Sequence, residues 1–188
     1  MSLLVIGTLA YDTIETAHER REEILGGSAV YFSLASSCFT PTALVGVVGR
    51  DFRAEHIAAL EGAGVDLEGL EIADGETFRW SGRYEADWNT RHTLDTQLNV
   101  LEHFDPKVPE RHASARFVFL ANSSPQVQAR GLDQVLDPEF VMLDTMNLWI
   151  ETERSELVTL FREVDCVVLN DGEARLLTEF DNLIRAAP

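Results

Sequence analysis

The sequence is poor in positive charge, and Lys107 is its only lysine. It contains 15 Lys and Arg residues against 32 Asp and Glu residues in 188, which gives a formal net charge of −17. Nucleic acid and anionic lipid surfaces repel such a chain, so we expect neither nucleic acid nor a membrane as its partner. We interpret the acidic residues as a well-solvated surface.

Cysteine is also scarce. Cys38 and Cys166 are the two cysteines, and they form neither a Cys-x-x-Cys pair nor a metal-type spacing with a histidine. Both lie among apolar residues, so we predict two buried thiols, as suits a protein of the reducing cytoplasm. The five histidines are scattered without a pair four residues apart, and we predict no zinc site.

Long apolar runs and several well-known fingerprints are missing too. No stretch reaches the ~18 apolar residues of a membrane span, and Met1-Ser2 leads directly into an apolar strand rather than a signal peptide. The chain has no Gly-x-Gly-x-x-Gly, no Walker A loop and no Gly-x-Ser-x-Gly. These absences argue against a dinucleotide-binding Rossmann enzyme, a P-loop protein and an α/β-hydrolase.

Short apolar runs alternate with helical segments along most of the chain. Continuous apolar runs of this length are typical of strands that are buried on both faces. The alternation predicts one α/β domain over residues 1–188, with a mostly parallel sheet between two layers of helices. We predict strands at residues 3–8, 42–49, 116–120, 140–143 and 166–169, and helices at residues 28–39, 52–63, 125–135, 153–164 and 174–178.

Two segments break this alternation. Residues 11–23 are polar and charged, and within residues 70–103 the stretches 78–84 and 92–100 alternate apolar with polar side chains. That period is typical of strands with one wet face, so we predict an antiparallel excursion from the main sheet. Packing between strands explains its aromatic residues better than a stacking platform does; they are Phe78, Trp80, Tyr84 and Trp88.

Two polar or glycine-rich sites follow the first strand. Asp12 can accept hydrogen bonds from two hydroxyls of a sugar, or it can cap a turn or a helix, and the sequence leaves both open. Gly26-Gly27 precedes a helix that has Ser28 near its N-terminus. The glycine pair lets the backbone approach a ligand closely, or it makes a plain turn.

Two further sites follow later strands. Asp144 and Asn147 can form the polar wall of a nucleotide or sugar site, or they can form a turn in which Asp144 bonds its own backbone. Asn170 and Glu173 are three residues apart, so their side chains converge if a helix begins there. They can hold water around Mg²⁺, although a capping box is the better interpretation of this pair in isolation.

Taken in order, these segments resemble the ribokinase-like (PfkB) family of carbohydrate and nucleoside kinases. The resemblance covers the whole chain, and it is carried by the combination rather than by any one motif. The matching segments are Asp12, Gly26-Gly27-Ser28-Ala29, residues 45–51, Gly64-Val65-Asp66, Asp144-Thr145-Met146-Asn147 and Asn170-Asp171-Gly172-Glu173.

The resemblance implies a three-layer α/β/α fold with a β lid, which residues 11–25 and 70–103 would contribute. It assigns substrate binding to Asp12, Gly26, Gly27 and Ser28. It assigns the nucleotide and phosphate side to Asp144, Asn147, Asn170 and Glu173, with Asn170 and Glu173 holding Mg²⁺ through water. It further implies ATP as cofactor, a sugar or nucleoside as partner and a homodimer formed through the lid, on which Arg79, Arg83 and Asn99 are candidates for substrate choice.

The chain also departs from the family. Tyr31 stands where members often have Asn, and no carboxylate occurs near Asn122, where some members bind substrate with Glu. The Gly-x-Gly-Asp motif with the catalytic Asp is absent, so the resemblance covers the N-terminal two-thirds of a kinase and no residue here is assigned as catalytic. We expect ATP-dependent phosphoryl transfer to a sugar or nucleoside hydroxyl for the family, and inactivity for these 188 residues alone. The alternative is a non-catalytic protein that binds a sugar or nucleoside, or mediates an interaction.

Overall fold

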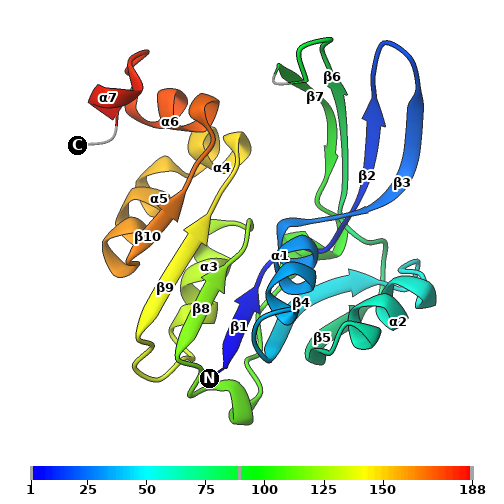
Figure 1. The fold of residues 1–188 in the computed structure, drawn as a ribbon, viewed down its shortest axis with the longest axis vertical. Helices are drawn as coiled ribbons and strands as arrows, with labels where there is room; N and C mark the ends of the chain where they lie inside the picture. The colour runs from blue at the N-terminus through cyan, green and yellow to red at the C-terminus, as the bar shows by residue number, and fades with distance from the viewer. Residues whose placement is uncertain (1, 89, 187–188) are drawn as a thin grey trace.

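The computed structural model describes residues 2–88 and 90–186, and Figure 1 shows their fold. A central sheet of six strands has the order β10-β9-β8-β1-β4-β5, and every neighbouring pair is parallel. This confirms the predicted mostly parallel sheet. The strands are β1 (Leu3–Ile6), β4 (Thr42–Gly49), β5 (Val65–Ala73), β8 (Phe117–Leu120), β9 (Phe140–Asp144) and β10 (Cys166–Val168).

Helices cover both faces of this sheet, as the apolar runs require. Every residue of β4 is buried, which is why its sequence is continuously apolar. In β1, Leu4 and Ile6 pack into the core under α3 (Pro125–Leu132) and α5 (Arg154–Leu160), whereas Val5 packs into the core under α1 (Ser28–Ser37) and α2 (Ala54–Gly62). Successive side chains of a strand point to opposite faces, so one strand serves two cores and the fold has three layers.

Three further helices lie in the second half of the chain. They are α4 (Asn147–Thr152), α6 (Asp171–Thr178) and α7 (Leu183–Ala186), with 3₁₀ turns at Asn99–His103, Glu110–His112 and Phe161–Glu163. The sequence did not predict α4, and the predicted helix at 153–164 is α5 followed by a 3₁₀ turn. No helix among the described residues is long and apolar enough to span a membrane.

A second sheet of four strands rises beyond the carboxyl ends of the central strands (Figure 1), and we call it the lid. Its order is β3-β2-β6-β7. The pairs β3–β2 and β6–β7 are antiparallel, and β2 pairs with β6 in parallel. The strands are β2 (Ala10–Glu15), β3 (Arg20–Gly26), β6 (Arg79–Tyr84) and β7 (Arg91–Gln97).

The lid corresponds to the two predicted segments, 11–25 and 70–103, but β2 begins at Ala10 and β3 ends at Gly26, each one residue outside the first segment. The predicted segment begins at residue 70, but β5 continues in the central sheet to Ala73, paired with β4 through Gly49. The second half of the lid therefore begins after residue 73.

The order of the strands fixes where a ligand is expected. β1 lies between β4 and β8, because the chain first adds β4 and β5 on one side of β1 and later adds β8, β9 and β10 on the other. In open α/β sheets the crevice at such a reversal, outside the carboxyl ends of the strands, is the usual ligand site. The lid stands over this edge of the sheet (Figure 1).

The prediction that both cysteines are buried is wrong. Cys38 is exposed and Cys166 is half-buried. The helix α1 buries Ala29, Val30 and Ser33, and the next position on that face is residue 37, so Cys38 points away from the core. Cys166 belongs to β10, which pairs only with β9 among the described strands and is only partly covered.

Ion pairs join the lid to the main body, which is the central sheet with its covering helices. Arg79 of β6 donates from Nη2 to Asp51 Oδ2 at 2.8 Å and from Nη1 to Glu23 Oε1 at 3.0 Å. Asp51 follows β4, and its Oδ1 also accepts from the backbone N and the Oγ1 of Thr77, both at 2.7 Å. The Arg79 side chain is only 26% exposed. Because Asp51 belongs to the main body, this cluster holds β6 at a fixed position over the central sheet.

Replacing Arg79 with alanine is expected to lower the free energy of unfolding by about 1–3 kcal/mol, because Asp51 would lose its charged donor in a half-buried setting. Arg83→Ala is the matched control on the same strand. Arg83 pairs with Glu15 on the surface, with a side chain that is 53% exposed, and such pairs contribute about 0–1 kcal/mol. Urea unfolding of both variants tests this, and equal losses would show that Arg79 does not hold the lid.

Candidate functional site

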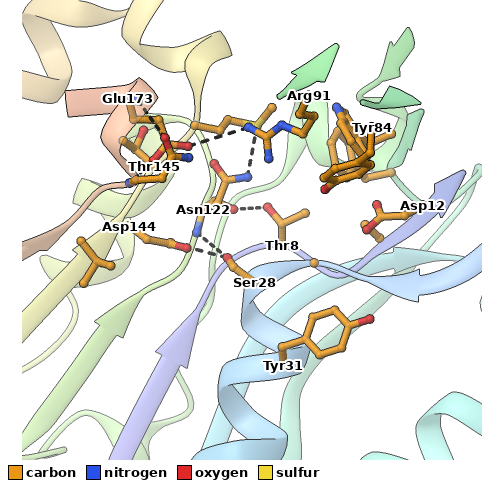
Figure 2. Close-up of a pocket in the computed structure, with 17 residues that line it drawn as sticks. Thr8, Asp12, Ser28, Tyr31, Tyr84, Arg91, Asn122, Asp144, Thr145 and Glu173 are labelled. Atoms are coloured by element: carbon orange, nitrogen blue, oxygen red, sulfur yellow. Dashed lines mark hydrogen bonds and ion pairs between the residues drawn. The ribbon is translucent and has the colours of Figure 1, made fainter. Parts of the chain in front are cut away.

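A cavity of about 360 Å³ lies between the lid and the carboxyl ends of the central strands (Figure 2). Its volume is within the ~300–1,000 Å³ of small-molecule pockets. The lid wall contains Ala10, Asp12, Phe78, Trp80, Tyr84 and Arg91. The opposite wall contains Thr8, Gly27, Ser28, Tyr31, Asn122, Asp144, Thr145, Met146, Val168, Asn170 and Glu173. Of the eight predicted site residues, Gly26 and Asn147 do not line the cavity.

The wall formed by the main body is built from strand ends. Thr8 follows β1, Asn122 follows β8, Asp144 ends β9 and Asn170 follows β10. Thr8 Oγ1 donates to the backbone oxygen of Asn122, which ties the ends of two adjacent strands together. Parallel strands bring their carboxyl ends to one edge, so residues as far apart in the sequence as Thr8 and Asn170 share one cavity.

Gln128 holds the ends of β8 and β9 in place from the face of the sheet that α3 covers. It is fully buried in α3, and its Nε2 donates to the backbone oxygens of Leu120 (3.0 Å), Ala121 (3.2 Å) and Asp144 (2.9 Å). A buried amide donor is costly unless it is satisfied, so these contacts set the position of the Asp144 carbonyl, whereas Gln128 Oε1 has no partner among the described residues. A single Gln in a helical segment carries no sequence signal for this role.

Asp144 is half-buried and its carboxylate faces the cavity (Figure 2). Ser28 Oγ donates to Asp144 Oδ1 at 3.5 Å and accepts from the backbone N of Asn122 at 2.8 Å. Burial raises the pKa of Asp144 to about 7, against opposing hydrogen bonds from Ser28, Asn122 and its own backbone, and the nearby Glu173 raises it further. Asp144 thus lines the cavity at the end of β9, and the chain forms no turn there.

Asp12 faces the cavity from the lid. It lies inside β2, so the alternative interpretation of this residue as a turn or helix cap is wrong. Burial raises its pKa to about 6, and the charge of Arg91 opposes that rise. Asp12 forms no ion pair with a described residue, and a half-buried carboxylate of this kind is suited to accepting hydrogen bonds from a ligand.

The two glycines of the Gly-Gly pair do different things. A Cβ on Gly26 would lie 2.3 Å from Asp12 Oδ2, so Gly26 makes room for the Asp12 carboxylate instead of lining the cavity. Gly27 is the N-cap of α1 and has φ of 95°, in the region that favours glycine. A Cβ there would lie 2.3 Å from the backbone oxygen of Thr8. Local packing therefore requires both glycines.

Asn170 and Glu173 form a capping box at the start of α6. Asn170 Oδ1 accepts from the backbone N of Glu173, and Glu173 Oε2 accepts from the backbone N of Asn170, both at 2.9 Å. This confirms the capping-box interpretation, but both residues also line the cavity. Glu173 is 6% exposed, and burial raises its pKa. Its Oε1 lies 3.9 Å from Arg91 Nη2.

Asn147 lies apart from the others. It is the first residue of α4, and it is exposed. Its neighbours Thr145 and Met146 line the cavity in its place. The Oγ1 of Thr145 is buried without a hydrogen-bond partner among the described residues. Because α4 begins directly after Met146, the chain turns away before it reaches Asn147.

The aromatic wall of the lid follows from the period of β6. Phe78, Trp80 and Tyr84 lie two or four residues apart, so they point to the same face and line the cavity. A Cβ on Gly82 would lie 2.0 Å from Cη2 of Trp80, so the indole lies over Gly82. The sequence favoured packing for these aromatic residues; Phe78 and Trp80 do pack in or against the core, and together with Tyr84 they also line the cavity.

The predicted specificity residues of the lid point elsewhere. Arg79 and Arg83 lie on the other face of β6, where they pair with acidic residues, and Asn99 Nδ2 donates to the backbone oxygen of Thr77 at 3.0 Å. None of the three lines the cavity. Arg91 of β7 does, and the sequence had not singled it out; its guanidinium lies 5.6 Å from the centre of the Trp80 ring.

No protein-family model matches this chain, and no curated protein matches it either. Solved structures do match. Fructokinase from Halothermothrix orenii has a TM-score of 0.76 at 15% identity, over 99% of this chain and 74% of that one. Adenosine kinase from Sinorhizobium meliloti has 0.75 at 19%, over 98% and 69%. A nucleoside kinase from Burkholderia thailandensis in complex with inosine has 0.73 at 15%, over 98% and 66%.

These likenesses define a class of fold. The matched structures are ribokinase-family kinases, and at such low identity they establish the fold alone. The chain has the ribokinase-like fold, with the three-layer core and the separate lid sheet that the sequence resemblance implies. The chain spans 74% of the length of the fructokinase and 59% of the length of a ribokinase from Cryptococcus neoformans that it also matches.

Gly27→Ala is expected to lower the free energy of unfolding by about 3 kcal/mol, because it adds backbone strain and a clash with the Thr8 carbonyl. Gly62→Ala is the control. Nothing lies within 4 Å of a Cβ at Gly62, the last residue of α2, so its stability should stay within about 1 kcal/mol of wild type. Denaturant unfolding measures both, and a tolerated Gly27→Ala would refute the packing argument.

Asp144→Asn is expected to change how stability depends on pH. Asp144 titrates near 3.8 when unfolded and at about 7 when folded. Between these values the folded state keeps a proton that the unfolded chain has lost, so this contribution to stability is complete below the lower value and is lost as pH rises through the upper.

The stability of wild type relative to Asp144→Asn should therefore fall by about 2–4 kcal/mol between pH 4 and pH 8. Unfolding experiments across this range measure the difference. The exposed Asp137 supplies the control variant, Asp137→Asn. A difference that does not vary with pH would show that Asp144 titrates normally.

Proposed function

We propose that this chain carries the acceptor-binding part and the lid of an ATP-dependent kinase that phosphorylates a hydroxyl of a sugar or nucleoside. The observation that carries the proposal is the cavity under the lid, in which Asp12 faces Asp144 and Glu173 across the strand ends. The fold supports it, because the matched structures are sugar and nucleoside kinases.

Asp12 is the residue that binds the hydroxyls of the acceptor. An ionised carboxylate offers several lone pairs and can accept from two adjacent hydroxyls. Thr145 Oγ1 is buried without a partner among the described residues and lines the same cavity, so a ligand can satisfy it. Gly27 lets the acceptor approach the backbone at the start of α1.

The residues on the far wall fit a magnesium ion. Glu173 Oε1 is not used by the capping box, and Asp144 lies in the same cavity. Burial raises the pKa of both carboxyls, so a nearby cation would favour their ionised forms. Glu173 and Asn170 would hold the ion through water, with Asp144 beside them, and bound Mg²⁺ would neutralise charge on the transferring phosphates.

The described cavity residues include few cationic side chains that could bind the triphosphate of ATP. Among the described residues that line the cavity, Arg91 is the only one with a cationic side chain, and it lies against Glu173 and Trp80. Phosphoryl transfer needs a base and several donors around the phosphates. We therefore assign this chain the acceptor side of the reaction and derive no step through ATP.

Association of two copies through the lid stays a prediction. Trp88 and Leu94 are exposed apolar side chains of the lid, at 65% and 48%.

Asp12→Asn is expected to weaken acceptor binding about 10- to 100-fold, because hydrogen bonds to a charged group contribute about 1.5–3 kcal/mol. Calorimetric titration of ribose, fructose, inosine and adenosine against wild type and variant tests this. Asp95→Asn changes an exposed carboxylate of β7 that does not line the cavity, and it should bind as wild type does. Equal binding by Asp12→Asn would remove Asp12 from the site.

The same titrations with Mg-ATP and a measurement of ADP release test the reaction. Release with one acceptor would show that these 188 residues are a complete kinase. Binding without release agrees with the acceptor part alone and with a non-catalytic binding protein. No binding by any acceptor would refute the proposed function.

A further inference from the structure

The cavity is lined by more acidic than basic side chains. Asp12, Asp144 and Glu173 line it, and among the described lining residues Arg91 alone is cationic. Arg91 is itself engaged, since its Nη2 lies 3.9 Å from Glu173 Oε1 and its guanidinium lies 5.6 Å from the centre of the Trp80 ring. A phosphate or carboxylate on the acceptor would enter a field of its own sign with no available cation to receive it.

The other arginines near the lid do not change this balance. Arg79 and Arg53 both pair with Glu23, and Arg83 pairs with Glu15. None of these three arginines lines the cavity. The alternation of β6 turns its basic residues outward and its aromatic residues inward, so bringing Arg79 or Arg83 into the cavity would require turning that strand over.

The aromatic wall has the character of a stacking surface. Trp80 and Tyr84 both line the cavity and are half-buried, so each side chain keeps some accessible surface beside the Arg91 guanidinium, which lies over the Trp80 ring. Their ring centres are 6.5 Å apart at an interplanar angle of 76°. The Trp80 indole lies over Gly82, where a side chain would displace it. A planar group can therefore pack on rings that the strand itself holds in place.

We infer that this cavity selects an uncharged acceptor with a planar ring, that is, a nucleoside rather than a phosphorylated or acidic sugar. The inference rests on the proposed function and narrows its substrate class. The charge of the cavity disfavours anionic acceptors, the aromatic wall favours a nucleobase, and Asp12 accepts from neutral ribose hydroxyls.

Calorimetric titration of the 188-residue chain with two matched pairs of probes tests the inference. Inosine against ribose measures what the planar ring adds, and we expect inosine to bind at least tenfold more tightly. Fructose against fructose 6-phosphate measures what the anion costs, and we expect the phosphate to weaken binding at least tenfold.

Variants then place the ring effect on one residue. Trp80→Leu should weaken inosine about tenfold or more, as expected for loss of a stacked base, while ribose changes less than threefold. Trp80→Phe keeps an aromatic face and should restore most of the inosine affinity, which separates stacking from a failure to fold. Trp88→Leu changes an exposed tryptophan outside the cavity and should leave both ligands unaffected.

The outcomes separate this inference from the proposed function. Tightest binding by fructose 6-phosphate would overturn the inference and leave the kinase proposal standing. Equal effects of Trp80→Leu and Trp88→Leu on inosine would also overturn it, because the ring would then bind elsewhere. Failure of all four probes to bind would overturn the proposed function and this inference together.

Discussion

The enclosure of acidic side chains between two sheets is the constraint on which this site depends. Asp12 enters from the lid, and Asp144 and Glu173 enter from the strand ends of the main body. Burial raises the pKa of all three carboxyl groups, so holding them ionised in the folded state lowers the free energy of unfolding. Among the described residues that line the cavity, only Arg91 offers them a guanidinium. Ligand hydroxyls and a divalent cation are the groups that would compensate the remaining desolvation.

Contacts within the main body fix the positions of the strand ends that form one wall of this cavity. β1 pairs with β4 on one side and β8 on the other, so the reversal of strand order falls beneath the lid. Gln128 ties the ends of β8 and β9 from one face of the sheet, and Ser28 joins the start of α1 to the same two strand ends from the other. Arg79 then holds the lid over this edge through Asp51. A polar contact on each side of the cavity thus restricts its shape.

The sequence predicted most of the fold because the pattern is local. A run such as β4 is apolar throughout, since both of its faces are buried, and this can be recognised without knowing its neighbours. The same holds for the Asn170 and Glu173 capping box, whose atoms meet within one helical turn. The exposure of Cys38 could not be predicted from its neighbours in the sequence, because the burial of a helix end depends on which face the helix presents to the sheet.

The sequence by itself determined the α/β alternation, the lid segments and most of the polar residues at strand ends, because each follows from side-chain period or from position beside an apolar run. Only the tertiary structure decided which of them meet. It turned Arg79 outward and Trp80 inward by the pleat of one strand, brought Arg91 to Glu173 across the cavity, and carried Asn147 out of it. These relations depend on register and on the packing of the lid against the sheet, which join residues far apart in sequence and leave no local pattern.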